Sequence, residues 1–329
     1  MSIDSAVLHP LFTLFTQLHA HAEALPAPIK SSLTELTAEA KQTGLDLFNL
    51  RRDQQARFFL TIAGAAGDAE AQYTMATCVS YLQGGVRLYS SETKKWLLLA
   101  AAQNHIPALM RLGDAESLAK AKALATTAPF AETPRAMVYL YVMTKDIEWL
   151  RKAAAAGDPE ALYRLAGAYE ENPELLPDAQ EREVKVALLT QQAADAGYAE
   201  AVSSLAFSRD KAVSVAEKQK RIIQLALMGN QEALLVYGYA LAGLSQDKTR
   251  APHTYGLEKN LPKACAVLEF LLITESGSLV RQPIEEDLWA LKHQMLDTRQ
   301  SEVYLRELQV QIPRVFSRMG PLLILGSPL

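Results

Sequence analysis

The chain has 329 residues, with 33 basic and 37 acidic side chains and a formal charge of −4. This balance argues against nucleic acid as the main partner, because nucleic-acid-binding domains present a strongly basic face. Cys78 and Cys265 are too few for a disulfide framework, which favours a reducing compartment. No apolar run approaches the roughly 20 residues that span a bilayer, and no secretory signal is visible before Lys30. We therefore expect a soluble, cytoplasmic protein with no membrane span.

The first part of the chain predicts three helices. Apolar residues recur at helical spacing over residues 5–23, and a second helix is predicted over about 31–43. We expect Gly44 to end this second helix and a third helix to follow over about 46–66. Residues 1–45 then form an N-terminal helical cap.

The next stretch introduces a turn that recurs along the chain. In Gly157-Asp158-Pro159-Glu160-Ala161, glycine suits the left-handed residue that closes a helix, aspartate can cap the next helix, and proline fits its first position. The same logic appears in turns that begin at residues 67, 104, 197 and 229. The turn at 197 has Tyr198 in place of a capping residue, and the turn at 104 has Asn104 in place of glycine.

The spacing of these turns indicates a repeat array. Successive turns are 37, 53, 40 and 32 residues apart, and periods near 34–40 are typical of stacked helical pairs. The gap of 53 residues contains an extra helix, predicted over about 134–143. One pair cannot bury its apolar face alone, so we expect an all-α solenoid of stacked pairs over residues 46–275.

Residues 276–329 predict C-terminal helices and an apolar tail. Pro283 and the three acids after it suit the start of a helix, and a paired-carboxylate active site is the alternative. A further helix is predicted over about 301–311. The tail contains a short run without a polar face, which we expect either to cap the last repeats or to insert into a partner or a second copy: Leu322, Leu323, Ile324 and Leu325.

Three segments carry a resemblance to a known family. Trp96 to Ala101 and Trp149 to Ala154 share a Trp-Leu-x-x-Ala-Ala pattern, and Gly256 to Ala264 is a loop that ends in Lys-Ala. With these motifs the chain resembles the Sel-one-like repeat family, a branch of the tetratricopeptide class, over about 60–272. The resemblance implies a right-handed α-solenoid, a bacterial cytoplasmic setting, and first helices that line a concave groove.

The same resemblance implies a partner-binding groove. Aromatic residues and arginine are the usual anchors of protein interfaces. The alternative for each residue is ordinary packing against a neighbouring helix or exposure to solvent. The predicted groove residues are Tyr73, Thr77, Met110, Arg111, Tyr163, Arg164, Glu170, Phe207 and Tyr239.

The sequence contains no recognisable catalytic constellation. It has no glycine-rich phosphate loop, no His-Glu-x-x-His and no Gly-x-Ser-x-Gly. His19 and His21 are two residues apart and do not face each other on a helix, and the acids at 170–171 and 181–183 are expected to be solvated. We therefore predict no enzyme activity, no metal and no cofactor. The expected function is a scaffold or adaptor that binds a protein or peptide, and the alternative is an immunity or inhibitor protein that neutralises one enzyme or toxin.

Overall fold

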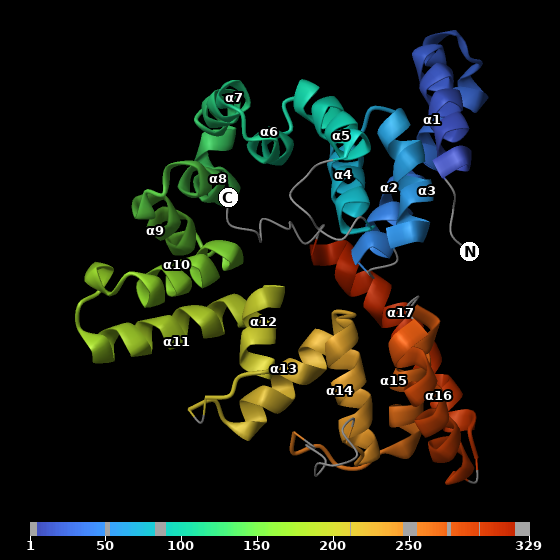
Figure 1. Ribbon diagram of the computed structural model, residues 1–329, viewed down its shortest axis with the longest axis vertical. Helices are drawn as coiled ribbons and strands as arrows, with labels where there is room; N and C mark the ends of the chain where they lie inside the picture. The colour runs from blue at the N-terminus through green and yellow to red at the C-terminus, as the bar shows by residue number, and fades with distance from the viewer. Residues whose placement is uncertain are drawn as a thin grey trace. The chain divides into compact units, whose positions relative to one another are not determined.

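The computed structural model describes residues 5–49, 53–82, 90–210, 212–245, 255–274, 278–295 and 297–319. Within these ranges the chain is helical and contains no strand (Figure 1), so the all-α fold is confirmed. Two compact units divide at residues 149 and 150. The predicted boundaries near residues 45 and 275 stay a prediction.

The first unit stacks consecutive helices, each on its neighbour in sequence, with α1 placed on α3. Its helices are α1 (Ser5–Ala20), η1 (Ala22–Ala24), α2 (Ala27–Asn49), α3 (Asp53–Ala65), α4 (Ala69–Leu82), α5 (Ser91–Ala102), α6 (Ile106–Leu112), α7 (Ala115–Ala125), η2 (Phe130–Glu132) and α8 (Pro134–Thr144). Helix α8 is the extra helix predicted inside the long gap between turns. Helix α9 (Ile147–Ala155) spans the division between the units.

The second unit continues the same arrangement and ends with α17 packed on α15. Its helices are α10 (Pro159–Glu171), η3 (Pro173–Leu175), α11 (Ala179–Asp195), α12 (Ala199–Ala206), α13 (Val215–Leu227), α14 (Gln231–Ala242), α15 (Leu261–Thr274), α16 (Ser278–His293) and α17 (Arg299–Met319). The predicted tail residues Leu322, Leu323, Ile324 and Leu325 lie outside the described residues.

The recurring turns have the geometry that their residues predict. The glycines at 67, 157, 197 and 229 have φ between 78° and 91°, and Asn104 takes the same left-handed position with φ of 63°. Asp158 caps α10 by accepting a hydrogen bond from the backbone N–H of Ala161 at 2.8 Å. Such a cap stabilises a helix by about 0.5–2 kcal/mol.

The predicted role of Gly44 is wrong. Helix α2 runs through Gly44 without a break, to Asn49. A Cβ atom at this position would lie 2.9 Å from Leu60 Cδ2 and 3.0 Å from Leu60 N. Glycine is therefore needed for the close approach of α2 and α3 rather than for a turn.

Small side chains and one buried cation hold the stack together. Alanines at the helix contacts, such as Ala161 and Ala201, are fully buried, as close packing of the pairs requires. Arg221 on α13 is also fully buried, and its guanidinium donates to Glu217 at 2.6 Å and to Asp195 at 2.7 Å. Since Asp195 is the last residue of α11, the Arg221 side chain joins α13 to α11, which belong to successive helical pairs.

Candidate functional site

Two of the five turns lack a capping side chain. Asp68, Asp158 and Asn230 each accept a hydrogen bond from the backbone N–H three residues later. The same position holds His105 before α6 and Tyr198 before α12, and neither side chain makes a capping hydrogen bond. These two helices therefore begin without a stabilisation that is typically about 1 kcal/mol.

In the second unit, the uncapped position supplies a ring to the preceding repeat. The ring of Tyr198 lies against the ring of Tyr163 on α10, with centroids 5.5 Å apart and an interplanar angle of 48°. Aromatic pairs at this separation contribute about 0.5–1.5 kcal/mol beyond their buried area. The contact thus joins the first helices of two successive pairs.

The first unit repeats this contact at equivalent positions. His105 lies against Tyr73 on α4, with ring centroids 5.0 Å apart and an interplanar angle of 38°. Tyr73 and Tyr163 each come six residues after the glycine of their turn. The uncapped position and the preceding tyrosine therefore form a recurring ring contact between repeats.

Charged groups surround the tyrosine pair of the second unit. Glu160 is only 4% exposed, and its Oε1 accepts a hydrogen bond from Arg164 Nε at 2.8 Å. Burial, followed by the negative charges of Glu160 and Glu200, raises the pKa of Tyr198, so its hydroxyl stays protonated. Glu200 is exposed, but desolvation by the side chains around its carboxyl group raises its pKa. Tyr163, Tyr198, Glu160, Arg164 and Glu200 are hereafter the tyrosine cluster.

The histidine contact of the first unit has its own charges. Lys41 Nζ lies 3.0 Å from Asp68 Oδ2 and 2.7 Å from Glu70 Oε2. Burial lowers the pKa of His105, and the carboxylates of Glu70 and Asp68 oppose this effect. Its Nδ1 atom is buried and has no hydrogen-bond partner within the described part of the chain. A neutral imidazole fits this environment better than a charged one.

Four predicted groove residues are buried packing residues. Tyr73, Thr77, Met110 and Tyr239 are 3–6% exposed, so the alternative of packing between helices describes them. Thr77 Oγ1 accepts a hydrogen bond from Arg111 Nη1 at 2.6 Å. The groove prediction stays a prediction for these four residues, which neighbouring helices cover in this structure.

The remaining predicted residues are accessible to different degrees. Arg111, Tyr163, Arg164 and Phe207 are half-buried, and Glu170 is exposed. Of these, the structure brings Tyr163 and Arg164 into one cluster. The sequence interpretation missed Tyr198, although the absence of a capping residue at this turn was a visible signal. A position that lacks the expected helix cap is often one where the residue has another role, as Tyr198 has in its contact with Tyr163.

The acids after Pro283 have structural roles. Pro283 lies inside α16 rather than at its start, so the predicted helix start is wrong. Asp287 Oδ2 accepts a hydrogen bond from the hydroxyl of Tyr239 at 2.7 Å, and Glu285 Oε1 lies 2.8 Å from Arg281 Nη1. These contacts join α14 to α16 and stabilise the turn of α16.

The described residues present neither a metal site nor a membrane span. Among the described residues, no group of histidine, cysteine and acidic side chains could hold a metal ion. In that same part of the chain, no helix has both the length and the apolar character needed to cross a membrane. Cys78 and Cys265 are buried thiols, and burial raises the pKa of Cys265.

The chain resembles a solved structure of the helical repeat type. No protein-family description matches the chain, and no curated protein matches it. Among solved structures, the chain is similar to c5321, described as a protective antigen present in uropathogenic Escherichia coli strains and displaying an SLR fold. The two are 16% identical, the match covers 95% of this chain and 86% of that chain, and the TM-score is 0.27. That protein is of the Sel1-like repeat class, which is the class that the motifs of this sequence resemble.

Proposed function

We propose that the chain is a non-catalytic interaction scaffold that binds a protein or peptide at the tyrosine cluster of α10 and α12. The observation that supports this proposal is the half-buried pair Tyr163–Tyr198 beside the guanidinium of Arg164. Tyrosine and arginine are the side chains most often found at interface hot spots. A cytoplasmic location is part of this proposal.

The chemistry of the cluster suits binding of a polar segment. The rings of Tyr163 and Tyr198 offer apolar surface to a partner, while the Tyr198 hydroxyl hydrogen-bonds to Glu200. Arg164, whose side chain is 24% exposed, presents donors held in place by Glu160. A partner with an aromatic or aliphatic side chain next to a carboxylate or backbone carbonyl would match these groups. The inhibitor or immunity role stays an alternative prediction.

The test compares partner capture by the wild type and by a cluster variant. Arg164→Ala alone would remove the guanidinium that hydrogen-bonds to the buried Glu160 carboxylate, which is costly. The variant therefore combines Tyr163→Ala, Arg164→Ala and Glu160→Gln. Its matched control is Tyr304→Ala/Arg306→Ala on α17, which removes the same residue types from outside the cluster.

Proteins captured from native lysate are identified by mass spectrometry, and the affinity of a stoichiometric partner is then measured with purified protein. We expect the cluster variant to weaken binding by more than about 1 kcal/mol, or about fivefold, and the control to bind like the wild type. Equal affinity of all three proteins would remove the tyrosine cluster from the proposal. Circular dichroism of each variant serves as the control that its helical fold is retained.

A further inference from the structure

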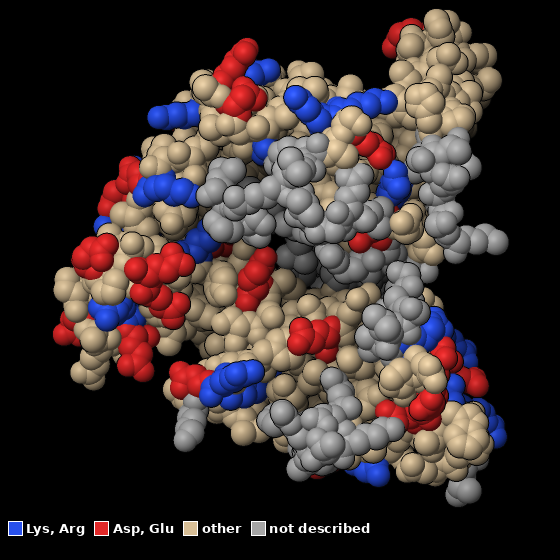
Figure 2. Space-filling model, in the orientation of Figure 1, with Lys and Arg blue, Asp and Glu red and all other residues tan. Residues whose placement is uncertain are grey.

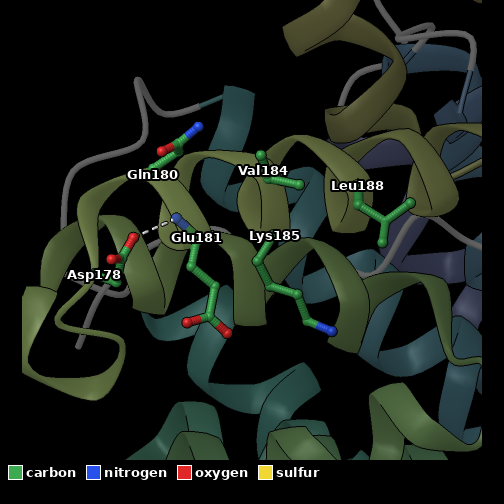
Figure 3. A pocket seen from close by; sticks show the side chains of 6 residues that line it. All are labelled: Asp178, Gln180, Glu181, Val184, Lys185 and Leu188. Carbon is green, nitrogen blue, oxygen red and sulfur yellow. Dashed lines mark hydrogen bonds between the residues drawn. The ribbon is translucent and has the colours of Figure 1, made fainter.

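The outward face of α11 carries apolar side chains that no described helix covers. Leu189 and Ala193 face the core, whereas Val184 is 63% exposed and Leu188 is 47% exposed. Val184 and Leu188 are one helical turn apart and lie on the same side of the helix (Figure 3). Together with Asp178, Gln180, Glu181 and Lys185 they line a shallow surface hollow.

Acidic side chains flank this apolar stripe. Glu181 and Glu183 come three residues and one residue before Val184, which places them on either side of it on a helix of 3.6 residues per turn. Acidic side chains also gather over the connection between α10 and α11, at the left of the view (Figure 2). Glu171 ends α10 and Glu174 lies in η3, ahead of α11, and both are exposed.

The acidic excess of the whole chain lies in this segment. Residues 170–185 contain six acids and two bases, a net charge of −4, which equals the formal charge of the chain. The other 313 residues therefore hold 31 acids and 31 bases. None of the six carboxylates forms an ion pair with a described residue, and Arg182 donates its hydrogen bond to the backbone oxygen of Leu176 at 2.7 Å.

This charge decides between the partners that an exposed apolar stripe could bind. Nucleic acids and anionic membranes are repelled by uncompensated carboxylates. A second copy in a two-fold dimer would place the same acidic segment against itself, because a two-fold interface uses one patch twice. A cationic partner gains attraction from the same groups, and a helix with apolar residues at i and i+4 matches the spacing of Val184 and Leu188.

We propose that the outward face of α11 docks a basic amphipathic helix of a partner protein. Its apolar side chains cover Val184 and Leu188, and its lysines and arginines lie over Glu171, Glu174, Glu181 and Glu183. This surface is separate from the tyrosine cluster, so the inference goes beyond the proposed function. It is a second docking surface on the same unit.

The probe is a fluorescein-labelled peptide of about 18 residues, long enough to present several helical turns. It consists of leucines at helical i, i+4 spacing with lysines at the other positions. The control peptide has the same leucines with glutamate in place of lysine. Fluorescence anisotropy with the full chain gives the affinity of each peptide at low and high salt.

Two variants alter the surface in different ways. Val184→Ser/Leu188→Ser removes the apolar stripe, and Glu181→Lys/Glu183→Lys brings the net charge of residues 170–185 from −4 to zero. The matched control is Leu98→Ser/Val215→Ser, which changes a leucine and a valine that are 50% and 60% exposed on other helices. All these positions are on the surface, so the variants are expected to fold.

We expect the lysine peptide to bind the wild type and to bind each surface variant about tenfold more weakly. Its affinity should fall with added salt, because the attraction between exposed charges is screened. The control variant and the tyrosine-cluster variant should bind the lysine peptide like the wild type, which separates this surface from the tyrosine cluster.

Three results would overturn the proposal. The first is equal affinity of the lysine peptide for the wild type and for Val184→Ser/Leu188→Ser. The second is equal binding of the glutamate peptide. The third is self-association of the wild type, or binding to phosphatidylserine vesicles, that is lost in Val184→Ser/Leu188→Ser, which would assign the face to a second copy or to a membrane.

Discussion

The contact between α14 and α15 predicts opposite effects for one substitution at two glycines. A Cβ atom at Gly238 would lie 2.7 Å from Leu268 Cδ2 and 2.9 Å from Leu268 Cγ, and Leu268 is fully buried. A Cβ atom at Gly167 on α10 would meet nothing within 4 Å. Both glycines lie inside helices of the second unit, so the two changes act on the same unit.

The magnitudes follow from two opposing effects. Replacing glycine by alanine inside a helix stabilises by about 0.5–1 kcal/mol. Forcing an extra methyl group into a packed core costs about 1–3 kcal/mol. Gly167→Ala should therefore be more stable than the wild type, and Gly238→Ala less stable than Gly167→Ala by about 1–3 kcal/mol, because the helical gain cancels between the variants.

The assay is urea unfolding followed by circular dichroism, with the midpoints and slopes of both variants compared. A second measurement uses the background Leu268→Ala, in which the opposing side chain is shortened. There Gly238→Ala should cost less, since residues in contact are energetically coupled. If Gly238→Ala is as stable as Gly167→Ala, or if Leu268→Ala does not reduce its cost, the proposed close contact of α14 and α15 is refuted.

Three further predictions concern charged and titratable groups. Arg221→Met should destabilise the second unit by about 2 kcal/mol in urea unfolding, because Glu217 and Asp195 each lose a charged hydrogen-bond donor; a change below about 1 kcal/mol would contradict this. Hydrogen bonds from Lys220 and Arg221 hold the pKa of Asp195 down to about 2, so its contribution is present above its ordinary pKa of 3.8 and is lost as pH falls towards 2. Asp195→Asn should be less stable than the wild type at pH 7 by less than about 1 kcal/mol, because the Asp195 side chain is 49% exposed and solvent screens its ion pairs with Lys220 and Arg221. Acid titration should show this difference in stability closing, and a constant difference would count against these ion pairs as its source. Because burial lowers the pKa of His105 below 6.5, the unfolded chain binds more protons, and stability should rise with pH through the window below 6.5. His105→Asn should flatten this rise when urea unfolding is compared at pH 5.5 and pH 7.5, and an unchanged rise would exclude His105 as its source.

The sequence by itself determined the turns and hence the class of fold. A left-handed glycine, a capping side chain and an N-terminal proline act within five consecutive residues, so Gly157 to Ala161 specifies its geometry without help from the rest of the chain. The same local chemistry located the repeats and made the missing cap at Tyr198 visible. Tyr163 and Arg164 came forward as binding candidates through the resemblance to the Sel-one-like repeat family.

Only the tertiary structure decided which side chains face one another. Tyr198 meets Tyr163, and Arg221 meets Asp195, across 35 and 26 residues of sequence. Gly44 lies inside a helix, where the close approach of Leu60 leaves no room for a Cβ atom. Tyr73 is buried although its position in the repeat matches that of Tyr163. Burial depends on neighbouring helices that differ from one repeat to the next, and no local pattern in the chain specifies those neighbours.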